Sequence, residues 1–182
     1  MTSTNQNTEQ LLVLCKSGNQ RAQLEIYNRY NKAMFNTAIR IVKDSFRAED
    51  IVQESFLAAF TKLSTLENLN LFGAWLKRIV VNNSIGYYNK IIKQNEVPLD
   101  SVIYKVEDEQ GLNENEQNND KVKLILGAMK TLKSNYNIGL TLHLIEGYDY
   151  EEICEIMDIS YANCRTLISR AKESLRKKLM MN

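Results

Sequence analysis

The chain contains one histidine and one proline among its 182 residues, together with seven glycines and three cysteines. So few helix-breaking residues, with a 3.6-residue apolar period in almost every long segment, predict an all-helical fold. The single histidine, His143, leaves little for acid–base chemistry, and the sequence shows no P-loop, metal-ligand cluster or nucleophile–base pair. We therefore expect a protein that is not an enzyme and needs no cofactor.

The cysteines and the apolar runs indicate where the protein works. Cys15, Cys154 and Cys164 are widely spaced and odd in number, which indicates a reducing cytosol without a disulfide framework. We expect them to be buried, since His143, Cys154 and Cys164 offer at most a weak zinc site. The N-terminal run MTSTNQNTEQ lacks the apolar core of an export signal, and no apolar run approaches the roughly 18 residues that span a bilayer. The sequence predicts a soluble, cytoplasmic protein without membrane insertion.

Charge is distributed unevenly along the chain, although the net charge is only +1. Residues 1–95 hold 12 Lys and Arg against 7 Asp and Glu, residues 96–120 hold 1 against 8, and residues 121–182 hold 10 against 7. The acidic segment also contains the only proline, Pro98, and the run EDEQGLNENEQNND, which has almost no apolar side chains. We predict two small helical domains, residues 1–94 and 121–182, joined by a flexible acidic linker over residues 95–120. Alternatively, the acids of this segment imitate nucleic acid and mask the basic surfaces.

The first domain reads as a helical bundle. In its second helix we expect Leu24, Tyr27 and Met34 to face inward. The four helices predicted before the linker are Glu9–Ser17, Arg21–Val42, Phe46–Leu63 and Leu71–Ile92.

Two segments of this bundle have polar patterns that packing does not require. In AEDIVQESF, an acidic row lies opposite Ile51, Val52 and Phe56, which suggests a basic protein partner. In WLKRIVVNNSIGYYNK, cations, amides and aromatic rings alternate, as in surfaces that hold phosphates and exposed bases. For the tyrosines the alternative is core packing, which we favour for Tyr88.

The last third of the chain contains two short amphipathic segments separated by Asp158-Ile159-Ser160, and Ser160 is a suitable N-cap for the second segment. A helix, a tight turn and a second helix make a helix-turn-helix arrangement. Six cations between Arg165 and Lys178 face one acid, Glu173, so the pattern favours DNA reading over an all-helical domain that touches no DNA. The side chains expected outward, toward base edges and phosphates, are Tyr161, Asn163, Arg165, Thr166, Ser169 and Arg170.

The order of these motifs resembles a known family. AEDIVQESFLAAF followed by FGAWLKRIVVNNSIGYYNK resembles the second conserved region of sigma-70 factors, and EGYDYEEICEIMDISYANCRTLISRAKESLRKKL resembles the fourth. More narrowly, the chain resembles the small extracytoplasmic-function (ECF) sigma factors from about Glu9 to Leu179. The resemblance implies a subunit without catalytic chemistry that directs core RNA polymerase to specific promoters and assists promoter melting.

The resemblance also implies roles for individual residues. The loop Leu66–Leu71 would capture a flipped-out base, and the polymerase flap is a further expected contact. Residues implied to bind the clamp helices of the largest polymerase subunit are Glu49, Asp50, Gln53 and Glu54. Those implied at the minus-ten element are Asn68, Asn70, Lys77, Arg78, Asn82, Asn83, Tyr87 and Lys90. Those implied at the minus-thirty-five element are Ser160, Tyr161, Asn163, Arg165, Thr166, Ser169, Arg170, Lys172, Arg176 and Lys177. Many relatives are held inactive by a membrane-anchored anti-sigma factor, which makes such a protein a candidate partner.

The sequence departs from the family pattern at Gly86, Asn89, Lys133, Asn137 and Asp158, so no promoter sequence can be transferred from a relative. Asp158 takes a turn position that often holds glycine, and Asp tolerates the left-handed conformation at modest cost. Two other functions compete with a sigma factor. One is a stand-alone helix-turn-helix regulator, and the other is an interaction module that binds polymerase but no DNA.

Overall fold

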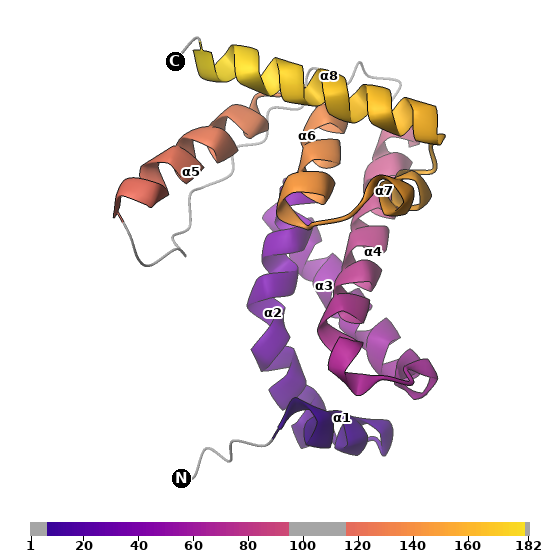
Figure 1. Cartoon of the computed structure of the whole chain (residues 1–182). Helices are drawn as coiled ribbons and strands as arrows, with labels where there is room; N and C mark the ends of the chain where they lie inside the picture. Colours follow the sequence, from indigo (N-terminus) through magenta and orange to yellow (C-terminus); the bar gives the residue numbers. More distant parts are fainter. Residues whose placement is uncertain (1–6, 95–115, 181–182) are drawn as a thin grey trace. The chain divides into compact units, whose positions relative to one another are not determined.

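The protein is all-α, as expected. The computed structural model describes residues 7–94 and 116–180, and every regular element of these residues is a helix (Figure 1). The chain divides into two compact units, Met1–Lys90 and Ile91–Asn182. The predicted acidic linker lies outside the described residues as far as residue 115, and residues 116–120 begin a helix. The predicted domain boundaries, 1–94 and 121–182, stay a prediction.

The N-terminal unit contains the four helices that the sequence predicts, with ends that differ by at most two residues. Two short 3₁₀ turns lie between the third helix and the fourth. The elements are α1 (Thr8–Lys16), α2 (Gln20–Val42), α3 (Ser45–Lys62), η1 (Leu63–Thr65), η2 (Leu69–Leu71) and α4 (Phe72–Gln94).

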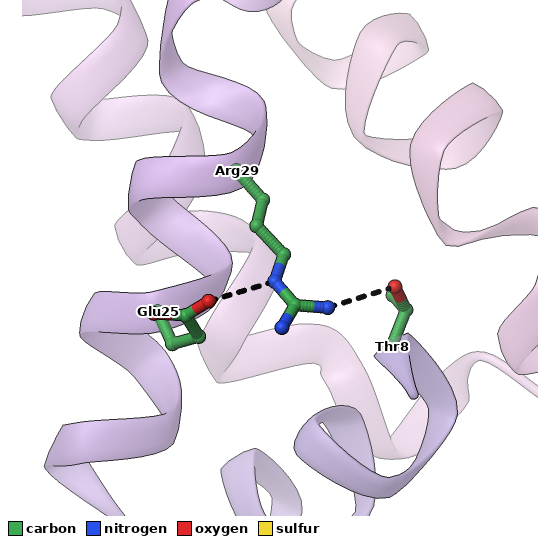
Figure 2. Close-up of polar contacts among 3 residues, drawn as sticks. All are labelled: Thr8, Glu25 and Arg29. Carbon is green, nitrogen blue, oxygen red and sulfur yellow. Dashed lines mark hydrogen bonds and ion pairs between the residues drawn. The ribbon is translucent and has the colours of Figure 1, made fainter. Parts of the chain in front are cut away.

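Local side-chain chemistry positions the ends of these helices. Gly18, at φ +79°, ends the turn after α1, and the Asn19 side chain accepts a 3.0 Å hydrogen bond from the Ala22 N–H at the start of α2. Asp44 caps α3 in the same way through the Arg47 N–H. Arg29 of α2 ties α1 in place, because its guanidinium pairs with Glu25 at 2.9 Å and reaches the Thr8 hydroxyl oxygen at 3.5 Å (Figure 2).

Aromatic rings connect α2 to α3 and α4. The Tyr27 and Phe56 ring centroids are 4.7 Å apart, and Tyr30 meets Phe72 edge-on at 5.3 Å. Leu24 was expected in this core, but that expectation was wrong: its side chain is 61% exposed, whereas Ile26 is fully buried. At about 100° per residue, Leu24 lies roughly 200° from Ile26 around the helix axis, so the two cannot both face the core.

The C-terminal unit is built on its last helix, α8, which packs against α5, α6 and α7 (Figure 1). Leu140, Ala171 and Leu175 form part of its buried core. The elements are α5 (Glu116–Lys130), α6 (Ser134–Leu140), the π-helical turn η3 (Thr141–Ile145), α7 (Tyr150–Met157) and α8 (Tyr161–Met180).

Asn137, one of the departures from the family pattern, is a buried polar link in this unit. Its side-chain N–H donates to the Met129 carbonyl of α5 at 2.7 Å, and its carbonyl oxygen accepts from the Thr141 hydroxyl at 3.3 Å. A buried amide with both ends hydrogen-bonded fixes the position of α5 against α6. No helix within the described ranges combines the length and apolar content that a bilayer crossing needs.

The cysteines occupy packed positions, and all three are free thiols. Cys15 and Cys164 are buried as expected, whereas Cys154 is half-buried. Burial raises the pKa of Cys15 to about 11. Burial, followed by the neighbouring Cys154, raises the pKa of Cys164 to about 11.

These raised pKa values predict slow alkylation. At pH 8 in the native protein, iodoacetamide should modify Cys154 well before Cys15 and Cys164, because only the thiolate reacts and burial disfavours it. Since protons stay bound up to a higher pH in the folded state, the native rate at Cys15 should keep rising between pH 9 and 11. In urea the rate should instead reach half of its maximum near pH 9.0, the ordinary pKa of a cysteine thiol. Peptide mass spectrometry measures each site, and equal native rates at all three would contradict the packing described.

Candidate nucleic-acid and polymerase interfaces

Helices α7 and α8 form the helix-turn-helix, and hydrogen bonds define each of its corners. At the start of α7, Asp149 and Glu152 form a reciprocal capping box, with bonds of 2.8 and 3.0 Å. Asp158 ends α7 in the left-handed region at φ 53°, which confirms the conformation expected for this turn. Ser160 is the N-cap of α8, as predicted, since its hydroxyl oxygen accepts a hydrogen bond from the Asn163 N–H at 3.3 Å.

One face of α8 is buried and the opposite face is exposed. The stripe Cys164, Ile168, Ala171 and Leu175 is buried at helical spacing. The outward face contains all six side chains that the sequence predicts there, namely Tyr161, Asn163, Arg165, Thr166, Ser169 and Arg170.

An aromatic series that the sequence analysis missed supports the start of α8. The His143 and Tyr150 rings lie 5.1 Å apart, and the Tyr150 and Tyr161 rings lie 6.2 Å apart. His143 also hydrogen-bonds through Nδ1 with the Tyr148 carbonyl at 3.2 Å. No sequence signal shows this arrangement, because it depends on η3, where one turn widens to a π-helix. The series holds Tyr161 at the outer edge of the helix-turn-helix.

The basic end of α8 extends the exposed face. Lys172 is half-buried, whereas Arg176 and Lys177 are exposed. The Lys177 ammonium pairs with Glu173 at 2.8 Å, and this hydrogen bond raises the pKa of Lys177. The pair is solvent-exposed, so a phosphate can replace the carboxylate at little cost.

The candidate residues of α4 separate onto different faces. Asn82 and Lys90 are exposed, whereas Lys77 and Arg78 are half-buried. Tyr87 lies toward α3, where the Arg47 guanidinium is 5.8 Å from its ring centroid.

Asn83 also points to α3. Its Nδ2 donates to the hydroxyl oxygen of buried Ser55 at 2.9 Å, and that hydroxyl donates to the Ile51 carbonyl at 2.6 Å. The side chain that was expected at the minus-ten element therefore has a structural partner at the interface between α3 and α4.

The loop before α4 has a defined shape. Asn68 Oδ1 accepts from the Asn70 N–H at 3.0 Å, which makes an Asx turn that leads into η2. Lys16 of α1 donates to the Leu66 carbonyl at 3.2 Å, so the loop is attached to the first helix. Asn68 and Asn70 are both exposed.

The acidic row lies on the outer face of α3. Glu49, Asp50, Gln53 and Glu54 are all exposed, whereas Ala48, Ile51, Val52, Ser55, Phe56 and Ala59 are buried. One cation of the same helix, Arg47, approaches Asp50 at 3.4 Å. Among the described residues, no three His, Cys, Asp or Glu side chains gather as metal ligands would.

Comparison with known proteins identifies the family. The family description "Sigma-70 region 2" matches residues 26–91, and "Sigma-70, region 4" matches residues 123–175. The ECF RNA polymerase sigma-E factor of Salmonella typhimurium is 30% identical over an alignment of 186 positions, gaps included. The alignment covers 96% of this chain and 95% of that protein. The chain belongs to the extracytoplasmic-function sigma factors of the sigma-70 family.

Other relatives agree with this ECF sigma factor in sequence and fold. The ECF factor SigM of Bacillus subtilis is 29% identical over 84% of this chain and 91% of its own length. Among solved structures, the sigma factor RpoE from Bartonella quintana, crystallised with the anti-sigma factor NepR, aligns with a TM-score of 0.59 at 22% identity. That alignment covers 87% of this chain and 96% of the Bartonella chain. CnrH, solved in complex with the cytosolic domain of CnrY, has a TM-score of 0.53 at 21% identity, covering 94% and 96%.

The family assignment decides between the functions that the sequence left open. The chain is an RNA polymerase sigma factor, and a stand-alone helix-turn-helix regulator is not favoured. The region 2 match includes the acidic row of α3 and the candidate face of α4, and the region 4 match includes the helix-turn-helix.

The Asn83–Ser55 hydrogen bond can be tested by stability. Asn83→Ala should lower the free energy of unfolding by about 1 kcal/mol, because one partner of a partly buried hydrogen bond is removed. Adding Ser55→Ala should cost less than the sum of the two single changes, since the two side chains share one bond. Urea unfolding followed by circular dichroism measures this. The matched control is exposed Asn82→Ala, expected to stay within about 0.5 kcal/mol of the wild type, and strict additivity would rule out the link.

Proposed function

We propose that this sigma factor binds core polymerase and promoter DNA through separate surfaces, and that its polymerase-binding surface and its DNA-reading surface lie on different helices. The polymerase surface is the acidic row of α3, formed by Glu49, Asp50, Gln53 and Glu54. The partner is the pair of clamp helices in the largest polymerase subunit, and the flap is a further contact. The observation that carries this proposal is that α3 presents acids outward while α8 presents cations outward.

DNA contacts divide between the two units. The exposed face of α8, from Tyr161 to Arg170, would read the minus-thirty-five element in the major groove, because amide, hydroxyl and guanidinium groups suit base edges there. Lys172, Arg176 and Lys177 would neutralise phosphates. In the N-terminal unit, Asn68 and Asn70 would meet an unpaired base, while exposed side chains of α4 would hold the opened strand.

The remaining properties follow from this role. The protein performs no catalysis of its own, so melting energy comes from binding the opened strand within the holoenzyme. It acts in the cytoplasm, where polymerase and promoter are found, through domains 1–94 and 121–182 and the linker between them. A relative with this fold was solved in complex with an anti-sigma factor, and a partner of that kind, membrane-anchored, would hold this chain inactive by covering the same surfaces.

The polymerase surface can be tested by charge reversal. Asp50→Lys with Glu54→Lys should abolish binding to core polymerase and run-off transcription, because a basic partner would then meet like charges. The fold should survive, since both side chains are exposed. Run-off assays on a fragmented genomic promoter pool measure this. A wild-type chain that starts no transcript, or a reversed variant that starts as many as the wild type, would rule out the proposed surface.

The DNA-reading face is tested by separate substitutions. Arg165→Ala and Arg170→Ala should each weaken holoenzyme binding to a cognate promoter by about 1–3 kcal/mol for every base that the side chain reads. Core binding should not change. The matched control is Lys130→Ala, an exposed cation on α5. Competition binding against promoters with single base changes gives the readout, and an equal decrease for every DNA sequence would mean phosphate binding instead of base reading.

A further inference from the structure

The acidic row of α3 has an apolar side chain at each end. Phe46, in the first turn of the helix, is 77% exposed, and Leu57, three turns later, is 68% exposed. Asp50 and Gln53 lie between them in the sequence and are also exposed. At about 100° per residue, these four side chains lie within about 60° of one another around the helix axis. They form one continuous outward row.

The two apolar ends are fixed in space by the helix that carries them. The face opposite the row is fully packed, since Ile51, Val52 and Phe56 are buried on it. The Asp44 cap holds the first turn, where Phe46 lies. With a rise of about 1.5 Å per residue, the Phe46 and Leu57 backbones are roughly 16 Å apart along α3. A partner would therefore meet two apolar side chains at a constant spacing.

Acidic side chains lie between these two apolar ends and on both sides of the row. Glu49 lies on one side of the row and Glu54 on the other, and both are exposed. Burying large apolar side chains against a partner is favourable, and aromatic side chains are enriched in protein interfaces. A complementary partner would have cations opposite the acids at the centre of the row and apolar side chains opposite Phe46 and Leu57.

We propose that Phe46 and Leu57 are apolar anchors for a basic helix of core RNA polymerase, with the acids between them pairing with its cations. This inference rests on the proposed polymerase surface and extends that surface by about one turn in each direction. The acids would set the orientation and association rate, and the apolar anchors would supply the part of the affinity that salt does not screen.

The test measures binding of the labelled full chain to purified core polymerase at low and high salt. Phe46→Ala should weaken binding about tenfold or more and Leu57→Ala about fivefold, in the range of side chains that become buried in an interface. Both decreases in affinity should be nearly the same at low and high salt. Phe46→Leu should retain most of the affinity, because the site needs apolar volume. The matched control is Leu24→Ala, which removes another exposed apolar side chain, on α2, and is expected to change binding less than about twofold.

The charge-reversed Asp50→Lys/Glu54→Lys variant separates the two proposals. If it binds core polymerase normally, the proposed polymerase surface fails, whatever the apolar variants do. If it no longer binds while Phe46→Ala and Leu57→Ala bind like the wild type, only the apolar anchors are overturned. Sedimentation of the chain alone provides a further outcome. Self-association that disappears in Phe46→Ala would assign the row to a second copy of the chain and overturn the inference.

Discussion

Burial of one apolar stripe on α3 and another on α8 determines which side chains these helices present to a partner. On α8 the stripe from Cys164 to Leu175 packs against the preceding helices, so Asn163, Arg165 and Ser169 lie on the exposed face. On α3 the same constraint leaves the acids outside. Each surface persists because turning the helix would expose its core side chains.

The acidic segment of residues 96–120, with 8 Asp and Glu against 1 Lys, explains the small net charge, because the residues on either side of it hold more Lys and Arg than Asp and Glu. A sigma factor with a strongly basic total charge would bind DNA non-specifically without polymerase. Here the cations of α8 are separated along the chain from the acids of α3, and Glu173 pairs with Lys177 even within the basic end. Under the proposed function, affinity for a promoter would depend on polymerase bringing both units to the DNA.

The sequence predicted the four helices before the linker, the two helices of the helix-turn-helix, the turn at Asp158 and the outward face of α8, because those features depend on local periodicity and capping. It misplaced Leu24, since apolar residues in a long helix occur on more than one face and only packing selects among them. Adjacent Asn82 and Asn83 looked equivalent, but a rotation of about 100° turns one to solvent and the other to Ser55. The aromatic series from His143 to Tyr161 depends on a π-helical turn, which no sequence pattern predicted.

The attachment of α1 has a practical consequence for dissecting the protein. The region 2 match starts at residue 26, within α2, and so omits the first helix. Yet Leu11 and Leu12 are buried, Arg29 reaches Thr8, and Lys16 hydrogen-bonds to the Leu66 carbonyl. A fragment cut at the family boundary would uncover apolar surface on α2 and release the loop that carries Asn68. The minimal unit for structural or binding work on this half of the molecule therefore has to start ahead of Thr8.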